Sequence, residues 1–147
     1  MGKSIVGLAA AAAVLLAAAA WAQAPEAEWV TKTVHGYRFA LAVETVLDPG
    51  APGEPRHARA MEHRVLVAVR EEASGGAARL SAVSLDVAEE GYQGQSVPLR
   101  PLGTGAARLY EARVRLERGL PYRVVVQATP EWGGRTLEAR FAYRHHH

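Results

Sequence analysis

Residues 109–117 read Leu-Tyr-Glu-Ala-Arg-Val-Arg-Leu-Glu, and this stretch decides the fold class. Every second residue in it is apolar, and the residues between are charged nearly throughout. The apolar set is Tyr110, Ala112, Val114 and Leu116. Because successive side chains of a strand point to opposite faces, the alternation predicts a strand with one face in the core and one in solvent. A sheet with one solvated face is typical of antiparallel architectures.

The same period of two recurs elsewhere in the chain, between turn signals. The further segments are 37–43, 61–70, 80–87, 122–129 and 136–143. A short piece at 96–99 is expected to pair at a sheet edge, because Pro98 has no amide hydrogen for a central ladder. Glycine- and proline-rich turns separate the segments and leave no room for a long helix. The sequence therefore predicts an all-β antiparallel β-sandwich of about six to eight strands with Greek-key connections.

The composition and the absence of known motifs exclude several classes of function. The 147 residues include no cysteine, which excludes a disulfide scaffold, a thiolate metal site and a thiol nucleophile. The 17 basic and 15 acidic residues are interspersed, so nucleic acid is not an expected partner. No serine-hydrolase elbow, zinc-protease motif, phosphate loop or dinucleotide fingerprint occurs. We predict that the protein is not an enzyme.

The first 22 residues have the pattern of a secretory signal peptide. A cationic start with Lys3 is followed by an apolar run at 5–20 and by a small-x-small motif that ends at Ala22. We expect cleavage after Ala22, a β-sandwich domain at 23–144 and a periplasmic or secreted location. An uncleaved membrane anchor is the alternative, since the run is close to the shortest that spans a bilayer.

The segment 109–126, with Phe141-Ala-Tyr143 further on, resembles the end of bacterial periplasmic immunoglobulin-like domains. Within these domains the segment is similar to two groups: the YtkA-like domains, and the copper-containing periplasmic proteins that accompany bacterial iron permeases. The shared element is a strand, a turn at Gly119 and then Tyr122, whose hydroxyl can bond back to the turn backbone as in a tyrosine corner. The resemblance implies an immunoglobulin-like sandwich and, for the second group, a shallow copper site of His and Met with iron handled nearby.

Two positions depart from the pattern of the iron-permease group. A His commonly precedes the Tyr in that group, at the position where this chain has Leu109. Acidic residues follow the strand His of the group, whereas Arg64 and Leu66 follow His63 here. One ligand that the resemblance implies is therefore missing.

The candidate metal ligands gather in residues 57–63. Met61 and His63 are two residues apart at the start of a predicted strand, so both side chains are expected on its core side. Imidazole suits Cu(II), and a thioether beside it favours Cu(I). His57 precedes the pair, and His35 on a neighbouring run is a possible fourth ligand. These residues predict a metal-handling accessory protein for copper or iron, with a metal transporter or another envelope protein as its partner.

A second interpretation of the same residues involves no metal. Met61 is then a core side chain, and His63 bonds to the backbone at the end of the sandwich. The function is then that of an interaction module, which docks on an envelope complex through loops and a charged sheet face. Trp132 in a glycine-rich turn and the exposed arginines Arg113 and Arg115 are the candidate contacts. The histidines at 145–147 are interpreted as a native tail or a purification tag.

Overall fold

The structure is a computed structural model that describes residues 28–46, 60–102 and 108–144. These residues form strands joined by turns, and among them no helix is long and apolar enough to cross a membrane. The strands are β1 (Trp29–Val34), β2 (Tyr37–Thr45), β3 (Ala60–Glu71), β4 (Leu80–Glu89), β5 (Gln95–Val97), β6 (Arg100–Leu102), β7 (Leu109–Glu117), β8 (Pro121–Pro130) and β9 (Leu137–Arg144). The predicted signal segment 1–22, His57 and the tail 145–147 lie outside the described residues.

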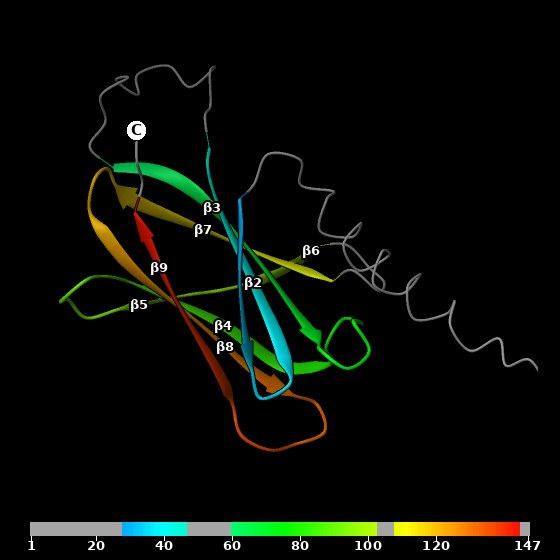
Figure 1. Cartoon of the computed structure of the whole chain (residues 1–147). Helices are drawn as coiled ribbons and strands as arrows, with labels where there is room; N and C mark the ends of the chain where they lie inside the picture. The colour runs from blue at the N-terminus through cyan, green and yellow to red at the C-terminus, as the bar shows by residue number, and fades with distance from the viewer. Residues whose placement is uncertain (1–27, 47–59, 103–107, 145–147) are drawn as a thin grey trace, which may run out of the picture.

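The strands form two antiparallel sheets, which we call sheet A and sheet B (Figure 1). Sheet A has the order β1-β2-β3-β7-β6, and sheet B has the order β5-β4-β8-β9. In both sheets the central neighbours are far apart in the sequence, since β3 pairs with β7 and β4 pairs with β8. Such non-sequential antiparallel neighbours are a feature of Greek-key connections. The predicted all-β sandwich is confirmed.

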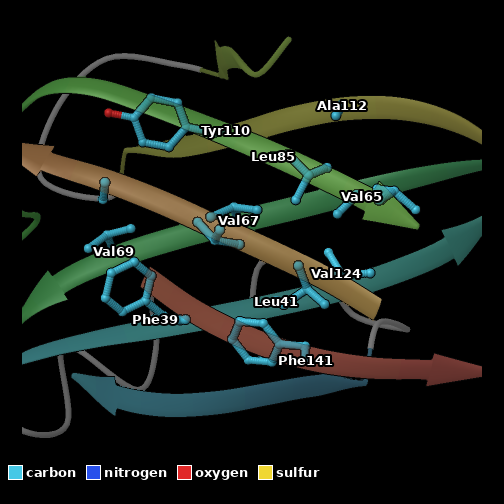
Figure 2. Close-up of a cluster of buried hydrophobic side chains, with 14 of the residues drawn as sticks. Phe39, Leu41, Val65, Val67, Val69, Leu85, Tyr110, Ala112, Val124 and Phe141 are labelled. Carbon is cyan, nitrogen blue, oxygen red and sulfur yellow. The ribbon is translucent and has the colours of Figure 1, made fainter. Parts of the chain in front are cut away.

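The core lies between the sheets and is built from the residues that the alternation marks as inward (Figure 2). Sheet A contributes Phe39, Leu41, Val65, Val67, Val69 and Tyr110, and sheet B contributes Leu85, Val124 and Phe141. Phe39 and Val67 have no solvent-exposed surface. Burial of a Val, Leu or Phe side chain stabilises a fold by about 1.5–3 kcal/mol. This shared layer of side chains therefore holds the two sheets face to face.

Two strands were not predicted from the alternation, and both lie at the edges of sheet A. β6 is only three residues long. β1 carries Lys32 at an inward position, where its Nζ lies 5.6 Å from the ring centroid of Phe141 in β9. A lysine can cover apolar surface with its aliphatic stem and keep its charge at the rim, so this edge strand needs no apolar alternation. β5 confirms the predicted edge pairing near 96–99, since it joins only β4.

Candidate functional site

His63 lies in β3 on the inner side of sheet A, between Thr45 of β2 and Val114 of β7. Its side chain is entirely buried. The ring Nδ1 lies 2.9 Å from the carbonyl oxygen of Met61, so Nδ1 donates its hydrogen to that backbone acceptor. The ring of Tyr143 in β9 packs edge-on against the imidazole, with the centroids 6.1 Å apart and the planes at 73°. His63 therefore occupies a well-packed core position at one end of the sandwich.

Met61 lies two residues before His63, on the same side of β3 and at the rim of that end. The side chain is half-buried. Its Sδ lies 3.6 Å from the Nη2 of Arg118, which follows β7. The thioether therefore accepts a weak hydrogen bond from a guanidinium that is always charged.

These contacts do not fit a preformed copper centre. The bond from Nδ1–H to a backbone carbonyl leaves Nε2 as the unprotonated nitrogen, but a metal ion also needs access to that nitrogen, and the His63 ring is entirely buried. A second cation at the Met61 sulfur would meet the positive charge of Arg118. Throughout the described part of the chain, no group of three or more His, Asp or Glu side chains is placed to hold a metal ion.

His35 lies far from His63. It sits in the turn between β1 and β2, next to Tyr37, which pairs with Glu71, while His63 pairs with Thr45 at the other end of β2. Eight residues of strand separate the two ends, which corresponds to about 26 Å. His35 is exposed and has a φ of 46°, and Gly36 after it has a φ of 78°. The structure therefore does not bring His35 together with His63, because the hairpin reverses the chain at the opposite end of sheet A.

Arg113 and Arg115 project from the outer face of β7 and are exposed. Arg113 donates to Glu62 at 2.7 Å and to Glu111 at 3.3 Å, and these hydrogen bonds raise the pKa of the guanidinium above its ordinary value. Arg115 donates to the carbonyl oxygen of Ala60 at 3.2 Å. Ion pairs in such exposed positions contribute little stability. The outer face of β7 is thus a charged surface with balanced signs.

Trp132 lies in the turn between β8 and β9, at the end of the sandwich away from the carboxyl end of β7 (Figure 1). Its side chain is 76% exposed. Gly133 and Gly134 follow it with φ values of 80° and 109°, which only glycine adopts readily. Trp132 therefore lies toward the end of the sandwich opposite to the carboxyl end of β7, which carries Arg115.

Charged residues on the outer face of sheet B were not predicted as a site. Asp86, Arg123, Glu138 and Arg140 all line a groove there. The sequence marks these residues only as outward positions of three separate strands. Their grouping becomes evident only once the order β4-β8-β9 is known, because β4 is far from β8 and β9 in the sequence.

No protein-family model matches the chain, and a comparison with curated proteins also finds no match. Among solved structures, the chain is similar to a DUF4426 family protein from Pseudomonas aeruginosa, with a TM-score of 0.54 and 13% identity over 78% of this chain and 94% of the other. It is also similar to a copper-bound variant of FetP from uropathogenic Escherichia coli strain F11, with a TM-score of 0.55 and 9% identity over 81% and 95%. Likeness at such low identity concerns the fold. The resemblance seen in residues 109–143 thus extends to the whole β-sandwich, which has the same fold as FetP and the DUF4426 protein.

Proposed function

We propose that the protein is an exported, non-catalytic accessory protein that serves a copper- or iron-handling system of the bacterial envelope. The signal-peptide pattern at 1–22 supports export to the periplasm. The fold shared with copper-bound FetP supports the link to metal. The resemblance of 109–143 to proteins that accompany iron permeases supports a membrane metal transporter as the partner.

Within this role the protein acts by contact with its partner and not through a metal centre built on His63 and Met61. The burial of His63 is the observation that carries this choice, since its side chain has no solvent-exposed surface through which a metal ion could reach the ring. Trp132 supplies the contact. An exposed tryptophan on a turn offers a large apolar surface at low entropic cost, which is typical of the residues that dominate protein interfaces.

Direct copper binding at the end of the sandwich that carries Met61 and His63 is the second candidate. It is supported by the half-buried thioether of Met61 and by His57, which is three residues before Ala60 in the sequence. For this function the packing around His63 has to open so that Nε2 becomes accessible, and the bond from Nδ1 to the Met61 carbonyl can persist. Soft thioether and imidazole ligands together favour Cu(I).

Copper titration separates the two candidates. The protein is shortened to end at Arg144, so that the terminal histidines cannot contribute, and is titrated with Cu(I) and Cu(II) beside a Met61→Leu variant of similar volume. We expect no stoichiometric binding by either protein. Uptake of about one copper per chain that is lost in Met61→Leu would replace docking with direct binding.

The docking role has its own test. A photo-crosslinking amino acid is placed at position 132 in cells, and in a matched control at Tyr92, which is 68% exposed in another turn. We expect an adduct with an envelope metal transporter from position 132 and none from position 92. Equal adducts from both positions, or none from position 132, would contradict the assignment of Trp132.

A further inference from the structure

The outer face of sheet B carries a groove of about 440 Å³, on the side of the sheet away from the core. β4, β5, β8 and β9 all contribute residues to it. Its floor includes Ala88 and Val125, which point outward and yet are only 5% and 9% exposed. Charged and polar side chains surround this small apolar strip. A groove of this size lies in the range of sites for small molecules.

Two of the four charged side chains in the groove are already paired. Glu138 accepts a hydrogen bond from the Nε of Arg140 at 2.6 Å and another from the Nε2 of Gln127 at 3.2 Å. These bonds hold the pKa of the Glu138 carboxyl below its usual value. Glu138 and Arg140 therefore neutralise each other along the β9 side of the groove.

Asp86 and Arg123 are the two remaining charges. In the described part of the chain, neither side chain makes a hydrogen bond or a close ion pair, although the Arg123 charge helps to lower the pKa of the Glu138 carboxyl. Asp86 pairs in register with Val125, and Arg123 pairs with Ala88, so the two charges are diagonal neighbours on one face of β4 and β8. Diagonal positions in a sheet are about 7–8 Å apart. The groove thus presents one carboxylate and one guanidinium whose hydrogen-bonding capacity is unused, beside an apolar floor.

We infer that this groove binds a small zwitterion, either a free α-amino acid or a dipeptide. The ligand ammonium group is bound by Asp86 and the ligand carboxylate by Arg123, while its aliphatic part covers Ala88 and Val125. The two charges of such a ligand match the two unpaired charges of the groove in sign. A simple anion would leave Asp86 unpaired, and a simple cation would leave Arg123 unpaired, so each of them is expected to bind more weakly.

Nuclear magnetic resonance titration of the full protein tests this inference. The probes are leucine, glycyl-leucine, and two blocked forms of the dipeptide: N-acetyl-glycyl-leucine without the ammonium group and glycyl-leucine amide without the carboxylate. We expect amide shifts confined to β4, β5, β8 and β9 residues that line the groove, and about tenfold weaker binding for each blocked form. Tighter binding of leucine than of the dipeptide would identify a free amino acid as the ligand, and tighter binding of the dipeptide would identify a dipeptide.

Charge-neutral variants complete the test. Asp86→Asn and Arg123→Gln each remove one charge at nearly constant size, and each should weaken binding about tenfold. Arg38→Gln, an exposed arginine on the outer face of sheet A, is the matched control and should bind like the parent. The dispersion of the amide spectrum checks that each variant is folded. The inference fails if no probe shifts the groove amides, if the blocked forms bind as well as the free dipeptide, or if Arg38→Gln weakens binding as much as the groove variants.

Discussion

The hydroxyl of Tyr122 accepts a hydrogen bond from the backbone amide of Glu117, at 2.8 Å and across the turn that contains Gly119. Gly119 has a φ of 79°, so the chain turns sharply between β7 and β8. The bond ties the first residues of β8 to the last residue of β7 and thereby joins sheet B to sheet A. This is the tyrosine corner that the sequence predicts from the spacing of Gly119 and Tyr122.

Tyr122→Phe is expected to lower the free energy of unfolding by about 1–3 kcal/mol, because the Glu117 amide loses its acceptor. Urea denaturation of the parent and the variant measures the change. Tyr92→Phe is the matched control, since the Tyr92 ring is 68% exposed, and its midpoint should not move. A Tyr122→Phe midpoint equal to that of the parent would show that the bond contributes nothing to stability.

His63→Ala is expected to lower the free energy of unfolding by about 2–4 kcal/mol, because it empties a fully buried position and removes the donor to the Met61 carbonyl. Thermal unfolding and copper titration are measured on the same samples. Any copper uptake should be unchanged when His63 is structural. A variant that melts like the parent but loses copper would support the metal-binding candidate instead.

His35→Asn is expected to raise the free energy of unfolding by about 0.5–1 kcal/mol. His35 and Gly36 both have positive φ values, and Asn-Gly is the preferred pair in hairpin turns of this kind. His35→Val is the opposite control and should destabilise, because a β-branched residue fits poorly at positive φ. Chemical denaturation of the parent and both variants should show that the free energy of unfolding decreases in the order Asn, His, Val at position 35. Any other order would contradict this account of the turn.

Stability is expected to fall at alkaline pH partly through Tyr143. Burial raises the pKa of the Tyr143 hydroxyl above its usual value of 10.0. The proton is then lost from the unfolded chain at a lower pH than from the folded protein, so stability is full below about pH 10 and declines as pH rises through the folded pKa. Denaturation at pH 8 to 11 should show a steeper decline for the parent than for Tyr143→Phe. Equal slopes would mean that Tyr143 does not contribute.

The sequence predicts the strands that have one face in the core and one toward solvent, as β7 shows most clearly. Their alternation follows directly from the two faces of a strand. The alternation does not predict β1, because β1 is an edge strand whose inner side is covered in part by Lys32 beside Phe141. No local pattern in Trp29–Val34 reveals this, since Phe141 is more than 100 residues further along the chain.

The candidate site was less predictable, for reasons of topology. The inward phase of Met61 and His63 follows from alternation, but the burial of the His63 ring depends on Tyr143 in the opposite sheet. The separation of His35 from His63 depends on the direction of the β1–β2 hairpin. Asp86 and Arg123 become neighbours only through the pairing of β4 with β8. Each of these facts is a long-range relationship, which residue types and spacing do not contain.

The pairing of β3 with β7 also affects how the protein folds during its synthesis. Glu62 and Arg113, which are joined by an ion pair across these strands, are 51 residues apart in the chain. Synthesis delivers the amino-terminal part first, so β3 emerges well before its neighbour and presents an unsatisfied edge with three apolar valines, Val65, Val67 and Val69, in the interval. Chains dominated by such distant pairings fold over milliseconds to seconds. The nascent protein therefore has a window in which self-association competes with folding, and its yield in cells should depend on chaperones that bind exposed strands.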